Sequence, residues 1–433
     1  KSLVLAQLAA DVVRWGGRVM ILAHRKELLL QNAGKIRSLD PRLNIGIYSA
    51  GLCSRDLHYP VTVAGIQSVY RRARQFGKQA LLIVDESHRI PAEGEGMYRT
   101  FLDEMEKINP KVRLVGLTAT PYRTGYGEIC GPDHLLNEVC CEVGIKELIE
   151  KGYLTSLTSK HCKHSVSTEG LAVRGGEFVQ KELEERMDQV ARVGAACEEI
   201  VKLTRERQSV LVFAAGVEHG EHVAAALSRI SGEEAIAIFG NSLPFERTDA
   251  IQRFREGSLK YLVNCMVLTE GFDAPGIDCV AMLRPTLSPG LWVQMVGRGS
   301  RKAPGKRECL VLDFGGNALR HGPVDKIRVK KPKKKPMEDG DEEEGPAEPP
   351  AKHCPECREV VLIGERACPA CGYAFPGRER KHDTRPGDAP VISRPPRFEE
   401  YTVSWAGYFV HTKQNAPDGA PKSMRVEYTT NAF

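Results

Sequence analysis

Two adjacent carboxylates, Asp85 and Glu86, end an apolar run of aliphatic residues that begins at Leu81. Such a run is typical of a buried parallel strand, and ligands of open α/β sheets lie at the carboxyl ends of such strands. One carboxylate there can hold Mg²⁺ through its water shell, and the other can take a proton from an attacking water. The alternative is a helix start, where the pair only favours the dipole of the next helix.

A Lys1-Ser2 pair precedes the amphipathic helical pattern of residues 3–14. In a phosphate-binding loop, the lysine reaches the β- and γ-phosphates of a nucleotide and the hydroxyl ligates Mg²⁺. The glycines that complete such a loop do not stand before Lys1. We therefore expect a fragment cut inside the loop, whose own binding of ATP is weakened, with coincidence as the alternative.

Polar side chains also follow the neighbouring predicted strands. His24 and Arg25 come after strand 18–23, Gln67 after strand 61–66, and Thr118 and Thr120 after strand 112–117. Strands that alternate with helices predict a parallel sheet covered by helices, so these polar groups gather at one edge. Basic residues at a strand-to-helix junction can bind backbone phosphates, or they can form a solvated first turn.

A second alternation runs from the strand at 209–214 to the strand at 309–314 and predicts a second α/β domain, with a cleft between the two. Arg298 and Arg301 lie three residues apart, and Gln294 precedes them by one helical turn, so the three can clamp an anion. A basic surface helix is the alternative. Gly297 and Gly299 disfavour it, because glycine weakens a helix.

The chain changes character after residue 320. A basic run and an acidic, Gly- and Pro-rich run form a predicted flexible linker, whose basic half binds nucleic acid or pairs with the acidic half. Two Cys-x-x-Cys pairs follow, and they predict a closed, structural four-cysteine zinc site formed by Cys354, Cys357, Cys368 and Cys371. The tail contains short strand-like stretches and is expected to be partly disordered, with a β element cut short.

The chain has 433 residues, a net charge of +5, 42% hydrophobic residues and 13 cysteines. This length predicts two or three domains. We expect no membrane segment and no secretory signal, and a reducing cytoplasm fits the scattered thiols. The mild positive charge permits nucleic-acid binding without requiring it.

The order of these motifs resembles that of superfamily 2 helicases of the DEAD/DEAH-box type. The matching stretches, over residues 1 to about 320, are Lys1-Ser2, His24 to Leu28, Asp85-Glu86-Ser87-His88, Thr118-Ala119-Thr120-Pro121, Thr269 to Asp273, and Gln294 to Arg301. The Thr-Ala-Thr-Pro-Tyr-Arg form and the trailing cysteines are similar to RadD-type bacterial and phage DNA helicases. Ser87 stands where the family more often has alanine.

The resemblance implies an α/β fold of two tandem RecA-like parallel-sheet domains with ATP between them, followed by a small four-cysteine zinc knuckle and a short β-containing tail. We expect an ATP-binding domain at 1–150, a helicase C-terminal domain at 151–320, a linker at 321–351, a zinc module at 352–376 and a tail at 377–433.

The resemblance also implies roles for single residues. Lys1 and Ser2 bind the phosphates and Mg²⁺, and Asp85 and Glu86 hold the metal's water and polarise the attacking water. Arg298 and Arg301 act as arginine fingers, and Gln294 senses the γ-phosphate. The remaining nucleotide contacts are His88, Gly271 and Asp273. Thr118 and Thr120 couple hydrolysis to domain movement. Arg25 and Gln67 contact the nucleic-acid strand.

The sequence therefore predicts a hydrolase: an ATP-dependent helicase or translocase that uses ATP, Mg²⁺ and Zn²⁺. DNA, single-stranded or forked, is the expected substrate in repair or phage replication, with RNA as the alternative. A repair or replication protein is expected to bind the zinc module and tail. A catalytically impaired nucleic-acid-binding module and the motor subunit of a restriction system are the other hypotheses.

Overall fold

The computed structural model describes residues 1–91, 96–123, 127–132, 134–160, 162–269, 271–327, 351–356, 360–368, 371–375, 403–411 and 423–430. The chain divides into two compact units, Lys1–Ser393 and Arg394–Phe433. Most of the predicted linker, most of the tail and the predicted zinc ligand Cys357 lie outside the described residues. No helix in the described part of the chain is long and apolar enough to cross a membrane.

The first lobe of the larger unit contains a six-stranded sheet with the order β3-β2-β4-β1-β5-β6. All neighbouring strands are parallel except β2 and β3. The strands are β1 (Val19–Ala23), β2 (Ile45–Ser49), β3 (Ser54–Arg55), β4 (Val61–Gly65), β5 (Leu81–Asp85) and β6 (Arg113–Leu117). The residues of β1, β4 and β5 are all buried, as expected for strands covered on both faces.

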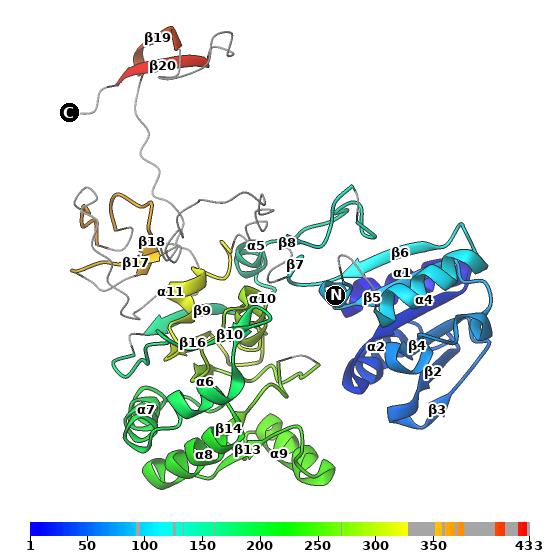
Figure 1. Ribbon diagram of the computed structural model, residues 1–433, viewed down its shortest axis with the longest axis horizontal. Helices are drawn as coiled ribbons and strands as arrows, with labels where there is room; N and C mark the ends of the chain where they lie inside the picture. The colour runs from blue at the N-terminus through cyan, green and yellow to red at the C-terminus, as the bar shows by residue number, and fades with distance from the viewer. Residues whose placement is uncertain are drawn as a thin grey trace, which may run out of the picture. The chain divides into compact units, whose positions relative to one another are not determined.

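Helices cover both faces of this sheet (Figure 1, blue to cyan). Val19 and Ile21 of β1 enter one hydrophobic core together with α1 and α2, and the alternate residues Met20 and Leu22 enter a second core with α4. The helices are α1 (Ser2–Arg14), α2 (Lys26–Leu39), α3 (Ile66–Val69) and α4 (Met97–Ile108), and the 3-10 turns are η1 (Ala50–Leu52), η2 (Ala73–Phe76) and η3 (Ser87–Arg89).

The second lobe repeats this architecture with a fully parallel sheet in the order β13-β14-β12-β15-β16-β9. Its strands are β9 (Ser156–Lys160), β12 (Val210–Phe213), β13 (Ala235–Ile238), β14 (Tyr261–Asn264), β15 (Cys279–Met282) and β16 (Glu308–Asp313). The edge strand β9 precedes the other strands of this sheet in the chain and comes from residues 155–185, which have no regular sequence pattern. The two parallel sheets confirm the predicted fold class.

Capping residues explain where the helices of the second lobe begin and end. Pro244 is at the start of α9, which ends at Gly257 in the left-handed conformation, and the Ser288 side chain caps α10 by accepting a hydrogen bond from Leu291 N. The helices are α6 (Gln180–Met187), α7 (Val190–Leu203), α8 (Val217–Ser231), α9 (Pro244–Glu256), α10 (Pro289–Val296) and α11 (Asn317–His321). A small β10–β11 hairpin (Val173–Arg174, Glu177–Phe178) precedes α6.

Short elements connect and follow the two lobes. The segment between the lobes contains β7 (Tyr122–Arg123), β8 (Gly127–Glu128) and α5 (Ile145–Glu150). After the second lobe, β17 (Ala351–His353) pairs antiparallel with β18 (Val360–Leu362), and Ala351 is part of the second lobe's core. The smaller unit contains an antiparallel hairpin of β19 (Val403–His411) and β20 (Ser423–Thr430).

Candidate nucleotide site and nucleic-acid interface

The acidic pair lies at the carboxyl edge of the first sheet. Asp85 is the last residue of β5, and Glu86 follows it in the left-handed conformation with φ 55° and ψ 52°. Both residues are buried, at 4% and 7% exposure. Glu86 precedes the turn η3 but makes no side-chain capping bond to it, so the helix-start interpretation does not account for its position. A non-glycine residue in this conformation is uncommon and is typical of functional sites.

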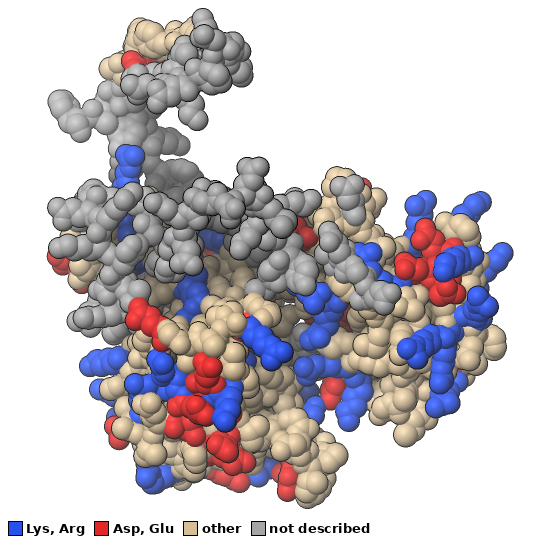
Figure 2. Space-filling view, in the orientation of Figure 1, with Lys and Arg blue, Asp and Glu red and all other residues tan. Residues whose placement is uncertain are grey.

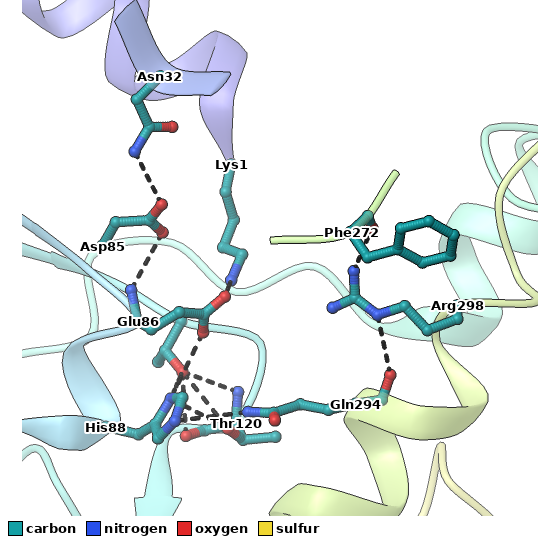
Figure 3. Close-up of polar contacts among 10 residues, drawn as sticks. Lys1, Asn32, Asp85, Glu86, His88, Thr120, Phe272, Gln294 and Arg298 are labelled. Carbon is teal, nitrogen blue, oxygen red and sulfur yellow. Dashed lines mark hydrogen bonds and ion pairs between the residues drawn. The ribbon is translucent and has the colours of Figure 1, made fainter. Parts of the chain in front are cut away.

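Four groups lie against the two carboxylates (Figure 3). His88 Nδ1 is 3.5 Å from Glu86 Oε2. Lys1 Nζ forms an ion pair with Glu86 Oε1. Asn32 Nδ2 donates to Asp85 Oδ2 at 2.9 Å, and Glu86 N donates to Asp85 Oδ1 at 3.0 Å. The lysine from the start of α1 therefore lies beside the acidic edge, where it can neutralise negative charge.

A polar network connects this edge to the second lobe. His88 Nδ1 lies 3.0 Å from Thr118 Oγ1 and 3.4 Å from Thr120 Oγ1, and Thr118 Oγ1 accepts a bond from Thr120 N at 3.0 Å. Gln294 of α10, in the second lobe, reaches the first lobe, where its Nε2 lies 3.4 Å from His88 Nε2 (Figure 3). The structure therefore brings Glu86, His88, Thr118, Thr120 and Gln294 into one cluster.

The two predicted finger arginines contact their own lobe. Arg298 Nη1 donates to Phe272 O at 2.6 Å, and Arg301 Nη1 donates to the same carbonyl at 2.9 Å. Arg301 also forms an ion pair with Asp273, which is predicted to contact the nucleotide. Gly271, beside them, has φ +70°, and a Cβ there would lie 3.3 Å from Glu27 Cβ of the first lobe.

Lys306 holds the segment that carries Arg301. Its Nζ donates to Gly299 O at 2.6 Å and to Arg301 O at 2.7 Å. Burial lowers the pKa of Lys306 below its ordinary value. Sequence analysis missed this lysine, because a single basic residue after a glycine-rich turn carries no distinguishing pattern.

The predicted strand-binding residues line a recess of the first lobe with a volume of about 490 Å³. Gln67 Nε2 donates to His24 O at 2.9 Å, and Arg25 Nη1 donates to Val267 O of the second lobe at 3.2 Å. No acidic side chain is among the described residues that line the recess, which include Lys26, Arg55, Tyr70, Arg71 and Arg72. In the visible face of this lobe, basic side chains surround one acidic cluster (Figure 2). The recess suits an anionic ligand.

Three of the four predicted zinc ligands gather in space. The sulfur atoms of Cys354, Cys368 and Cys371 all lie within 4.8 Å of one another, and Cys354 Sγ is 3.4 Å from Cys371 Sγ. Four sulfurs at about 2.3 Å from one zinc ion are about 3.8 Å apart, so this spacing suits the metal. Gly372 N donates to Cys368 O at 2.8 Å, which holds the residue after Cys371 close to Cys368.

Two family models and several known proteins are similar in sequence to this chain. Residues 1–123 match the family model "Type III restriction enzyme, res subunit", and residues 191–303 match "Helicase conserved C-terminal domain". The "Putative mitochondrial ATP-dependent helicase irc3" of Schizosaccharomyces pombe is 37% identical over 305 residues, which are 68% of this chain and 48% of that protein. A 51.5 kDa protein of a Lactococcus phage (isolate 7-9) is 26% identical, over 88% of this chain and 77% of that protein.

A solved structure supports the fold. The DNA-bound, ATP-dependent Type ISP restriction-modification enzyme LlaBIII matches with a TM-score of 0.50 and 17% identity, over 71% of this chain and 25% of that chain. With its ordered motifs, two RecA-like lobes and these family matches, the chain belongs to superfamily 2 of the helicases, of the DEAD/DEAH type. It spans 48% of the Schizosaccharomyces pombe protein and 43% of the "Putative ATP-dependent helicase IRC3" of Saccharomyces cerevisiae, which is 27% identical over 307 residues. The narrower RadD likeness stays a prediction.

Proposed function

We propose that the chain is an ATP-dependent helicase or translocase that acts on DNA. The observation that carries this proposal is the contact between Gln294 of the second lobe and His88, two residues beyond Glu86. It joins the acidic edge of one lobe to the other lobe. A change at the nucleotide can therefore be passed to the relative placement of the lobes, as a motor requires.

The first lobe supplies the proposed phosphate and water contacts. Lys1 would bind the β- and γ-phosphates, with Ser2 beside Mg²⁺, and Glu86 would accept a proton from the attacking water. The acidic edge fits Mg²⁺, because Asp85 and Glu86 offer hard oxygen donors. Glu86 Oε2 makes no hydrogen bond among the described residues, and its neighbour is His88 Nδ1 at 3.5 Å. When bound, Mg²⁺ would neutralise the charge of the phosphates.

The second lobe supplies the proposed fingers. Arg298 and Arg301 now bind Phe272 O and Asp273, and we propose that a γ-phosphate replaces these partners when ATP is bound. Gln294 would report the phosphate to His88, and Thr118 and Thr120 would pass the change along the first lobe. Asp273 would then turn to the ribose, with Gly271 leaving space beside it.

We propose that the nucleic-acid strand crosses the recess lined by Arg25 and Gln67. Its basic and aromatic lining can bind phosphates and stack bases without reading sequence. DNA is proposed over RNA because the family model of the first lobe and the LlaBIII structure belong to DNA restriction enzymes. Competition between labelled single strands of DNA and RNA of equal length tests this choice.

Hydrolysis tests the motor. We expect ATP turnover stimulated by single-stranded DNA, and we expect Glu86→Gln to lower it by about 100-fold or more, because general-base catalysis is worth about that factor. DNA binding should persist. The matched control is Glu104→Gln, which removes a partly exposed acid on α4 of the same lobe. Unchanged turnover in Glu86→Gln would contradict the assigned base, and DNA binding without any turnover would favour the binding module.

The motor subunit of a restriction system is the second candidate, favoured by the restriction-enzyme model over residues 1–123. For this candidate we expect movement along duplex DNA without separation of its strands. Displacement of a bound triplex strand from duplex DNA, with no unwinding of a forked substrate, would identify it.

The cysteine cluster is proposed to hold one structural Zn²⁺, with Cys357 as the fourth ligand. A reducing compartment, the cytoplasm, is proposed for the protein, since thiolate ligands and the buried Cys279 and Cys309 favour it. The knuckle and the tail hairpin, whose Trp405, Tyr408 and Val410 are exposed, are proposed to recruit a repair or replication protein. Loss of such a partner on removal of residues 352–433 tests this.

A further inference from the structure

A buried amide lies behind the acidic edge. Asn32 is on α2 and is only 1% exposed. The other buried residues of this helix are Leu28, Leu29, Ala33 and Ile36. Asn32 is therefore the one polar residue among the buried residues of α2. A buried amide is costly unless it is hydrogen-bonded, so a polar residue at this position needs a partner.

The partner of Asn32 is the metal-side carboxylate (Figure 3). Asn32 Nδ2 donates to Asp85 Oδ2 at 2.9 Å, and Glu86 N donates to Asp85 Oδ1 at 3.0 Å. Each oxygen of Asp85 thus has one fixed donor from within the lobe. A carboxylate has about four acceptor sites, so both oxygens keep capacity for a further ligand. The two donors fix the plane of the carboxylate.

Packing does not explain the residue. Asn32 Oδ1 is buried and has no hydrogen-bond partner among the described residues. Leucine has the same number and branching of heavy side-chain atoms, is somewhat bulkier, and would match the aliphatic residues of α2 and α1 without leaving an orphaned oxygen. An asparagine is therefore poorer than leucine for the core itself, and its benefit lies in the bond to Asp85.

We propose that Asn32 is a positioning residue that orients Asp85 toward the Mg²⁺ of the nucleotide. The proposal rests on the proposed function, because it assigns the acidic edge to a metal–nucleotide complex. Asn32 does not touch the metal or the phosphates itself. It acts from the outer side of Asp85, as residues that support metal-ligating carboxylates do elsewhere.

Metal affinity tests the proposal independently of turnover. In the full chain with ADP, we expect Asn32→Leu to weaken Mn²⁺ binding, measured by electron paramagnetic resonance of free Mn²⁺, by about 10-fold, as expected for loss of an outer support of a metal ligand. The Mg²⁺ concentration for half-maximal ATP hydrolysis should rise by a similar factor. Asn32→Ser, which keeps a hydroxyl donor and leaves room for a bridging water, should fall between leucine and the wild type.

The chain offers a matched control. Gln79 is also a buried amide of the first lobe, at 1% exposure; its Nε2 donates to Phe76 O at 2.8 Å, and its Oε1 is equally unpartnered among the described residues. Gln79→Leu should lower the melting temperature without changing Mn²⁺ affinity. If both leucine variants leave Mn²⁺ affinity within twofold of the wild type, Asn32 is only a core residue. If the wild type binds Mn²⁺ with ADP but shows no turnover, and Asn32→Leu still weakens that binding, the proposed motor fails while the assignment of Asn32 stands.

Discussion

His219 is a buried titratable group of the second lobe. It is the third residue of α8 and is 1% exposed, and its Nδ1 accepts a hydrogen bond from Ala215 N at 3.1 Å. Burial lowers the pKa of His219 to about 4, against the partial opposition of Asp188. Protonation at Nδ1 would also break the bond from Ala215. The folded lobe therefore requires the neutral imidazole.

We predict that His219→Asn makes stability less sensitive to acid. Because the folded-state pKa of His219 lies below its ordinary value of 6.5, the unfolded chain binds the proton more tightly. Stability is complete above pH 6.5 and is lost as pH falls toward 4, by about 2 kcal/mol at pH 5. Asparagine keeps an acceptor for Ala215 N and does not titrate, so its melting temperature should fall less between pH 7.5 and pH 5.

His222, one turn further along α8, gives the opposite control. Its Nδ1 lies 2.8 Å from Asp188 Oδ1, and this contact raises the pKa of His222. Its contribution to stability is present at low pH and is lost as pH rises, so His222→Asn should make the acid loss steeper. Equal pH profiles for the two variants and the wild type would show that neither histidine governs the acid response.

Sequence patterns predicted single residues best where they stand at strand ends. Asp85, Glu86, Thr118 and Thr120 were expected at one sheet edge and lie together there with His88, whereas His24, Arg25 and Gln67, expected at the same edge, line the recess. Asn32 was not expected, because one asparagine inside an amphipathic helix has no spacing that marks it. The left-handed backbone of Glu86 was equally hidden, since glutamate has no preference for that conformation.

At the scale of elements, the cysteine knuckle has a small core of its own and is also packed against the second lobe. Cys354, Val361 and Cys368 are buried, and Tyr373 and Phe375 pack against them. So small a core cannot hold the fold without a metal or another cross-link. Lys352 Nζ lies 3.8 Å above the Phe375 ring, and Ala351 of the same strand is in the second lobe's core. The knuckle is therefore anchored at its first strand.

We predict one zinc ion per chain, bound by this knuckle. Cys354→Ser and Cys371→Ser should each remove the metal, measured by atomic absorption, because a hydroxyl does not replace a thiolate ligand. Cys53→Ser, which changes an exposed thiol of the first lobe, should keep it. In the wild type, removal of the metal by a chelator should make the cysteines of the knuckle reactive toward thiol reagents. It should not lower the melting temperature of the two lobes. A metal-free chain whose knuckle thiols resist those reagents would contradict the zinc site.

Strand and helix order followed from the sequence because burial of parallel strands leaves continuous apolar runs. The runs ending at Asp85 and at Asp313 are both strands of the two sheets. The edge strand β9 was harder to predict. Only Leu157 of its five residues is buried, so Ser156–Lys160 has the composition of a loop and pairs with β16 only through tertiary context.

At the scale of the whole molecule, the two lobes contact each other in two places. One is the proposed nucleotide site, and the other lies beside the recess proposed to bind nucleic acid. Glu27 of α2 forms an ion pair with Arg247 of α9 at 2.6 Å, and Arg25 donates to Val267 O. Sequence analysis assigned Arg25 to nucleic acid and did not predict the pair, because no local pattern joins residues 220 positions apart. Strand binding at Arg25 would therefore change a contact between the lobes.

We predict that the Glu27–Arg247 pair favours the arrangement of lobes that binds ATP. Arg247→Glu should raise the KM for ATP by about two- to fivefold, since a partly exposed pair is worth about 0.2–1 kcal/mol and like charges oppose each other by a similar amount. Adding Glu27→Arg restores opposite charges and should return KM toward the wild-type value. The effect should shrink at high salt, because ions screen the pair.

Arg253 provides the control on the same helix. It pairs with Glu234 and Asp249 inside the second lobe, so Arg253→Glu breaks more exposed ion pairs without touching the first lobe. This variant should leave the KM for ATP unchanged. If Arg253→Glu and Arg247→Glu raise KM equally, the effect comes from the stability of the second lobe. If the charge swap fails to restore KM while Arg247→Glu raises it, Arg247 acts on another partner. Rescue by the swap alone identifies a direct contact between the lobes that nucleotide binding uses.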